Sequence, residues 1–139
     1  MATLQSAIDE IQTEVRALSG IRSAPDEPPD QMGAYPFAVA YAGKGVWSSQ
    51  TPETKVGLHD IVIELHVARK DLARDVTSAM SYSDSIPNAI MLALKDGTFS
   101  AIETFADIAY EFVGMGWGGV DTLGFRFTVR AVKMSSAIS

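Results

Sequence analysis

A strict two-residue alternation in the last third of the chain is the strongest constraint on its fold. A period of two with aromatic and β-branched residues is typical of a half-buried β-strand. One side carries Leu123, Phe125, Phe127, Val129 and Ala131, and the other carries Gly124, Arg126, Thr128, Arg130 and Val132. The sequence therefore predicts a strand here, with its apolar side against a core.

This strand decides the interpretation of the glycine cluster that precedes it. Residues 114–119 read Gly-Met-Gly-Trp-Gly-Gly and match the letter of the dinucleotide-binding pattern G-x-G-x-x-G. That pattern binds a pyrophosphate only when a helix follows it, because the phosphate sits at the helix N-terminus. Since a strand follows here, we expect a glycine turn between two strands.

The first third of the chain divides into a helix and a loop. Apolar residues spaced by three and four predict an amphipathic helix over residues 3–18, with Thr3 as its N-cap and Gly20 just beyond its end. Prolines and acidic residues alternate through residues 21–35, which indicates a long extended loop.

The middle of the chain contains short strands separated by turns. The predicted segments are a strand over 36–42, a turn over 43–45, a short strand over 46–49, a polar loop over 50–57 and a strong strand over 58–69. Alternation of apolar and polar residues is clearest in the last of these.

A broken helix is predicted next. It begins near Asp71 and is interrupted between Ser83 and Pro87, because proline removes a backbone donor and collides with the preceding turn. A second helical piece ends at Gly97, and another strand lies within residues 101–112.

These elements predict a single α+β domain over residues 1–133, followed by a flexible C-terminal tail over 134–139. We expect one mixed or antiparallel sheet of about four to five strands. The N-terminal helix and the broken central helix would pack mainly on one face of that sheet.

Composition excludes several classes of function. The net charge of −6 argues against tight binding of nucleic acid through the general surface. The chain has no cysteine, which excludes disulfides and thiolate catalysis. Its apolar runs are far shorter than the roughly 20 residues that a membrane-spanning helix needs. No P-loop, nucleophile elbow or zinc-protease motif occurs, so we expect no enzyme activity, cofactor or metal.

The two histidines lie seven residues apart on one predicted strand and should point to opposite faces. His66 shares its face with Asp60 and Glu64. Because residues two apart on a strand are separated by about 6.5 Å, we expect a solvated or interface-facing polar row without direct contacts.

Charged and aromatic residues near turns are the candidates for contacts with other chains. The basic ones are either solvated or form salt bridges across a subunit interface to acidic loops. The tryptophans either cap the core or anchor an interface. The candidates are Trp47, Arg69, Arg74, Trp117, Arg126 and Arg130, together with Asp26, Glu27 and Asp30 in the loop.

The order of several segments resembles the tail terminator proteins of long-tailed bacteriophages, also called tail-completion or head-to-tail joining proteins. The resemblance covers roughly residues 4 to 133. It is carried by the segments 36–41, 45–47, 57–72, 76–89 and 116–129.

The resemblance implies a virion structural protein, assembled in the host cytoplasm and located in the tail–neck region. Its subunits form a ring, typically a hexamer, on the end of the tail tube. The ring stops tube polymerisation and offers a surface to the head connector or head-closure protein, while DNA passes through the ring lumen. The partners are therefore other copies of the chain, the tail-tube protein and the connector, with no membrane, no cofactor and no catalytic residue.

The resemblance also implies subunit contacts through edge strands, charged pairs and long loops, here residues 22–35 and 43–57. Two alternatives remain open. The first is another phage neck or tail component, such as a head-closure or tail-tube-like protein. The second is a nucleotide-binding enzyme that uses the turn at residues 114–119.

Overall fold

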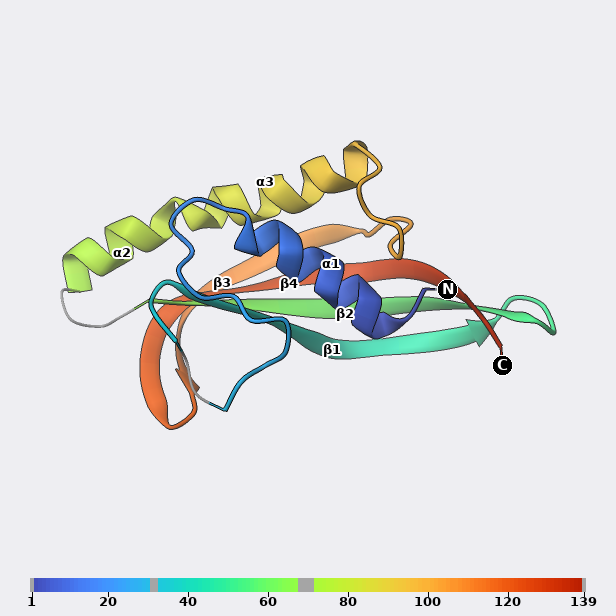
Figure 1. Ribbon diagram of the computed structural model, residues 1–139, viewed down its shortest axis with the longest axis horizontal. Coiled ribbons are helices and arrows are strands. Elements are labelled where there is room, and N and C mark those ends of the chain that lie inside the picture. Colours follow the sequence, from blue (N-terminus) through green and yellow to red (C-terminus); the bar gives the residue numbers. More distant parts are fainter. Residues whose placement is uncertain (1, 31–32, 68–71, 139) are drawn as a thin grey trace.

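The computed structural model describes residues 2–30, 33–67 and 72–138 (Figure 1). Its elements are α1 (Leu4–Arg16), β1 (Phe37–Ser49), β2 (Thr54–Val67), α2 (Leu72–Met80), α3 (Tyr82–Lys95), β3 (Asp107–Trp117) and β4 (Val120–Ala137). The strands form one antiparallel sheet in the order β1-β2-β4-β3. All three helices lie on the same face of it, so the predicted α+β class is confirmed.

The helix α1 begins where the sequence predicts. Thr3 accepts a hydrogen bond from the Ser6 amide, and the Ser6 hydroxyl accepts one from the Thr3 amide, which forms a capping box. Ile8, Ile11 and Val15 face the sheet and are buried. Each such burial contributes about 1.5–3 kcal/mol, so packing on the sheet is the main force that holds this short helix.

The sheet supplies the other half of this core. Its buried side chains on the helix side are Ile61, Ile63, Leu65, Phe125, Phe127, Val129, Val132 and Met134. α3 adds Ile86 and Ile90, both fully buried.

β1 is one continuous strand where the sequence predicted two strands and a turn. The pair Ala42–Ile61 is followed by the pair Gly45–His59, so two residues of β1 oppose one residue of β2. This is a β-bulge, which bends a strand without ending it. The predicted turn at 43–45 is therefore wrong, and the short strand predicted after it extends β1.

The turn between β1 and β2 lies further along the chain, at residues 50–53, so β2 begins inside the predicted polar loop. At the other end, β4 pairs with β2 as far as the pair Thr54–Ala137, and Met134 is fully buried. The flexible tail predicted from Met134 is wrong, because this pairing holds the C-terminal segment in the sheet.

A second bulge inverts the alternation of β4. The pairing register with β2 shifts between Val129 and Val132, and Ala131 has a φ of 55°. The carboxylate of Asp60 accepts a hydrogen bond of 3.1 Å from the Ala131 amide. As a result Val132 turns into the core, while Lys133 joins the opposite side of the sheet.

The central helix breaks earlier than predicted. Ser81 separates α2 from α3, and Pro87 lies inside α3. An interior proline costs roughly 3 kcal/mol. Burial of Ile86 and Ile90 on either side of it contributes about 1.5–3 kcal/mol each, which is sufficient to keep the helix intact.

The glycine cluster forms a tight hairpin turn, as predicted, but only part of it turns. Gly114 and Gly116 belong to β3, while Gly118 and Gly119 make the turn with φ angles of 58° and 82°. Two consecutive positive φ angles define the type of two-residue turn that joins antiparallel strands. β4 follows directly, so the cluster does not precede a helix.

The β3–β4 hairpin bends away from the helices and curls beneath the sheet (Figure 1). Gly124 permits this bend, because a Cβ atom at that position would lie 1.7 Å from the Leu65 carbonyl oxygen on β2. The two backbones can come so close only where no side chain stands between them.

Replacing Gly124 with alanine therefore tests the bend. We expect G124A to lose about 3 kcal/mol or more in the free energy of unfolding, because the clash is with backbone and cannot be relieved by a rotamer change. The matched control is G114A in the same hairpin, where the nearest atom to the added carbon lies 4.0 Å away. Urea unfolding measures both, and equal stabilities of the two variants would contradict this explanation of the bend.

Candidate functional site

A chain of buried and half-buried polar side chains lies under the curled hairpin, on the sheet face opposite the helices. The Thr122 hydroxyl of β4 lies 2.5 Å from His66 Nδ1, and His66 Nε2 lies 2.8 Å from Glu64 Oε1. The Tyr41 hydroxyl of β1 donates to the other oxygen of Glu64. We call Tyr41, Glu64, His66 and Thr122 the polar clasp, because together they join three strands.

Trp117 covers the polar clasp from the end of β3. Its ring centroid lies 6.1–6.3 Å from the rings of Phe37, Tyr41 and His66. Its indole N–H donates a 2.7 Å hydrogen bond to the carbonyl of Pro29. The described contacts of Trp117 are thus within the molecule, where it closes a second, smaller core and ties the N-terminal loop to it.

The charges of the polar clasp follow from these contacts. Burial raises the pKa of Glu64, but the hydrogen bonds from His66 and Tyr41 and the nearby Arg126 guanidinium outweigh it, so the net pKa is lowered. Burial and the bond to Glu64 raise the pKa of Tyr41 to about 12. Both ring nitrogens of His66 have partners, the Thr122 hydroxyl at Nδ1 and the Glu64 carboxylate at Nε2.

The connectivity hydroxyl–imidazole–carboxylate is also that of a nucleophile, its base and an orienting acid. Catalysis requires in addition a place beside the nucleophile for the reacting atom. Thr122 is 1% exposed and His66 is 0% exposed. A substrate cannot reach this hydroxyl in the folded chain, so the arrangement serves to hold the hairpin on the sheet.

The expectation of a solvated polar row at His66 is therefore wrong. Glu64 and His66 are in direct contact and buried, because two long side chains bridge the spacing between their Cα atoms. Trp117, about fifty positions later in the chain, shields them from solvent. No local sequence pattern therefore predicts their burial. Tyr41 and Thr122 were missed for the same reason. The expectation that His59 and His66 point to opposite faces is confirmed, since they belong to separate clusters.

The two arginines of β4 form ion pairs within the chain. Arg126 Nη1 lies 2.9 Å from Glu111 Oε1, and Arg130 binds both carboxylate oxygens of Asp107 at 2.5 and 2.6 Å. Hydrogen bonding to Arg130 lowers the pKa of Asp107. Both pairs lie directly across β3 and β4, and exposed pairs of this kind contribute little stability.

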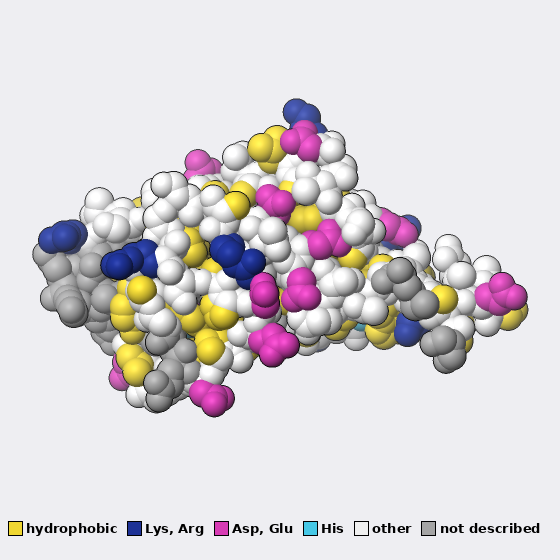
Figure 2. Space-filling model, viewed as in Figure 1, with side chains coloured by type: hydrophobic (Ala, Val, Ile, Leu, Met, Phe, Trp, Pro, Cys, Tyr) yellow, Lys and Arg dark blue, Asp and Glu magenta, His cyan; other side chains and the backbone are white. Residues whose placement is uncertain are grey.

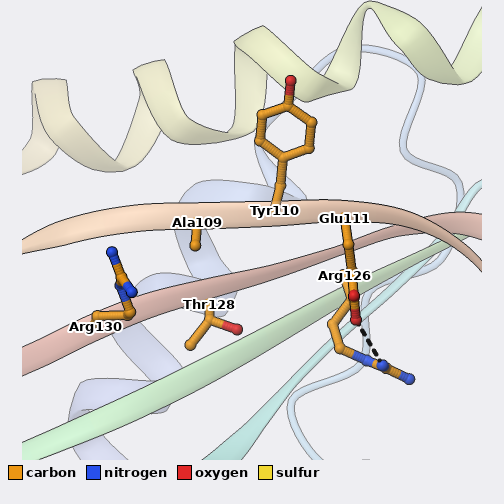
Figure 3. Close-up of a pocket in the computed structure, with 6 residues that line it drawn as sticks. All are labelled: Ala109, Tyr110, Glu111, Arg126, Thr128 and Arg130. Carbon is orange, nitrogen blue, oxygen red and sulfur yellow. Dashed lines mark hydrogen bonds and ion pairs between the residues drawn. The ribbon is translucent and has the colours of Figure 1, made fainter.

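These pairs flank a shallow groove of about 310 Å³ on the uncovered side of the hairpin (Figure 3). Ala109 and Thr128 lie between the pairs, while Tyr110 points the other way, toward the helices. The charged groups that line this groove already have partners of opposite sign. Another molecule in this groove would therefore be recognised by its shape and not by pairing with an unpaired charge.

The remaining candidates are spread over the surface. Asp26 forms an ion pair with Arg16, while Glu27, Asp30 and Arg74 are exposed. Arg69 lies outside the described residues. An interface role for each of them stays a prediction, and the structure does not gather the described ones into one site.

The most distinctive surface is the far end of the β1–β2 hairpin. Residues 43–58, which we call the distal arm, project beyond the N-terminal end of α1 (Figure 1). Val46 is 56% exposed, Trp47 38% and Leu58 46%. Of these three, the sequence predicts a contact role for Trp47 alone. The large apolar residues on either side of the polar loop were the signal that would have identified the other two.

One face of the distal arm is hollowed. A cavity of about 310 Å³ is lined by Lys44, Gly45, Val46, Leu58, Asp60 and Ala131. Val46 and Leu58 are directly paired across the two strands. On the other face, the ammonium of Lys55 lies 4.5 Å from the centre of the Trp47 ring. The distal arm thus exposes apolar surface on both faces, with lysines beside it.

No protein-family model matches this sequence, and no curated protein matches it. Among residues 2–30, 33–67 and 72–138, no helix is long and apolar enough to cross a membrane. The same described residues contain no cluster of three side chains suited to bind a metal ion.

The polar clasp predicts a pH dependence of stability. At pH 7 we expect E64Q to lose about 2 kcal/mol, the range of charge-assisted hydrogen bonds. The pKa of Glu64 is lowered in the folded chain. The advantage of the wild type is therefore complete above the ordinary glutamate value and is lost as pH falls through the lowered value. Urea unfolding at a series of pH values measures this difference.

The matched control is E111Q, which also removes a carboxylate that contacts Arg126, but an exposed one. Its cost should stay below about 1 kcal/mol. A difference between wild type and E64Q that does not change with pH would show that Glu64 is not ionised in the polar clasp.

Proposed function

We propose that this chain is a structural subunit of a bacteriophage tail, a tail terminator that assembles as a ring on the end of the tail tube. The distal arm is the observation that carries the proposal, because it leaves large apolar side chains exposed beyond the cover of the helices. The order of segments that resembles tail terminators supplies the identity of the assembly.

The distal arm has the properties of an assembly contact. Single exposed apolar residues are normal on protein surfaces. Here Val46 and Leu58 form a directly opposed pair on one face, and Trp47 lies on the other. Clustered apolar surface at a projecting end favours burial against another chain, and tryptophan is enriched at the centres of such contacts.

The sheet order is compatible with a ring. β1 and β3 occupy opposite edges of the sheet, and β1 carries the distal arm. If the arm of one subunit binds a different surface of the next, the contact is heterologous. Repeated heterologous contacts close into a ring when the rotation between subunits allows it.

The charge distribution suits a ring through which DNA passes. Between residues 4 and 30 there are six acidic residues and two arginines. Figure 2 shows acidic side chains spread over the face of the molecule that carries α1. A negative lining repels phosphates and so lets DNA slide without being held.

The proposal predicts which substitution breaks assembly. We expect L58K to shift the particle from ring to monomer, because it places a charge in the buried contact of the distal arm. The matched control is L92K on α3, where Leu92 has a similar exposure of 49% and the ring should persist. Sedimentation velocity of wild type and both variants measures the distribution of species. Loss of the ring in both variants, or in neither, would contradict the assignment of the contact to the arm.

Tail length separates a terminator from other neck components. Without a terminator the tube protein continues to polymerise, so a phage that lacks this chain should produce tubes of unregulated length. Tubes of normal length that lack heads would instead indicate a head-closure or connector component.

A further inference from the structure

His59 directly follows the distal arm in β2 and occupies a box that only glycines can form. It is 5% exposed and pairs with Gly45 on β1 and Val132 on β4. A Cβ atom on Gly45 would lie 2.0 Å from His59 Nδ1, and one on Gly57 would lie 2.2 Å from His59 Nε2. The imidazole thus fills the space of two missing side chains.

Trp47 forms the lid of this box. Its ring centroid lies 4.5 Å from that of His59 at an angle of 62°. A Cβ atom on Gly57 would also come within 2.9 Å of the Trp47 ring. The conformation of Trp47, the one aromatic residue of the distal arm, therefore depends on the ring beneath it.

The box suits a neutral imidazole and opposes a charged one. Within the described part of the chain, His59 Nε2 is buried without a hydrogen-bond partner. A neutral ring has one nitrogen that requires no acceptor, whereas an imidazolium has two N–H donors that both require one. An additional buried charge without a partner is costly.

The charged groups around His59 do not offset this cost. They are Lys44 on β1, Lys55 and Asp60 on β2, and Lys133 on β4. Asp60 and Lys133 follow His59 and Val132 directly and so lie on the opposite face, where Asp60 accepts from the Ala131 amide and Lys133 faces Glu103. The ammonium of Lys55 lies over Trp47, on the same face of the sheet as the His59 ring. Because it is itself a cation, it does not offset a positive charge on that ring.

We propose that His59 is a proton-operated latch of the distal arm: the neutral imidazole holds Trp47 against the sheet, and protonation releases it. Burial lowers the pKa of His59 from its ordinary value of 6.5. The closed arm is therefore fully stable above about pH 6.5 and loses stability as pH falls from there through the lowered value. The latch goes beyond the ring proposal, because it controls the shape of the arm in the single chain.

Acrylamide quenching of Trp47 between pH 8 and pH 5, at concentrations where the chain is monomeric, tests the latch. The Trp47 signal is taken as the difference between wild type and W47F, so that Trp117 is subtracted. We expect the quenching of Trp47 to rise toward that of a free indole, with a midpoint below pH 6.5, and H59Q to show no transition. A wild-type Trp47 signal independent of pH, or the same transition in H59Q, would overturn the proposal.

A second variant keeps the test decisive if H59Q fails to fold. G57A removes the space for the ring, so its Trp47 should already be accessible at pH 8 and should not change on acidification. A G57A protein with a shielded Trp47 and a wild-type transition would overturn the latch. Because every measurement uses the monomer, failure of ring assembly leaves this result interpretable on its own.

Discussion

The close approach of β4 to β2 at Gly124 is the contact on which the rest of the structure depends. It lets the β3–β4 hairpin fold under the sheet, and this carries Trp117 over Glu64 and His66. Two polar side chains that would otherwise face solvent are thereby buried. Buried ionisable groups are stable only with partners. Tyr41 and Thr122 supply these partners, and the hairpin keeps the pair buried.

The two ends of the sheet have different roles as a consequence. At the hairpin end, side chains with the chemistry of an acid–base relay are locked inside, where they act on structure. At the opposite end, the distal arm leaves apolar side chains exposed on both faces. We infer that the first end fixes the shape of the subunit and that the second end is where it joins its neighbours.

Local sequence patterns predicted the fold class, the capped first helix, the alternating strands and the absence of a helix after the glycine cluster. They failed where a bulge changes which side of the sheet the following side chains face. The bulges before Gly45 and at Ala131 let strands continue through positions that resemble turns or invert the alternation. Pro87 was misjudged because burial of its neighbours outweighs its intrinsic cost. The polar clasp and the His59 box were beyond such reasoning, since each depends on side chains brought together from three strands.

The most direct test of the account is the particle that the purified wild-type chain forms. Light scattering gives its mass, and negative-stain electron microscopy gives its shape seen end-on. The account predicts a closed ring of several copies around a central hole, with the distal arm of each subunit at the contact with the next. A particle with the mass of a single chain at every concentration tested would contradict it.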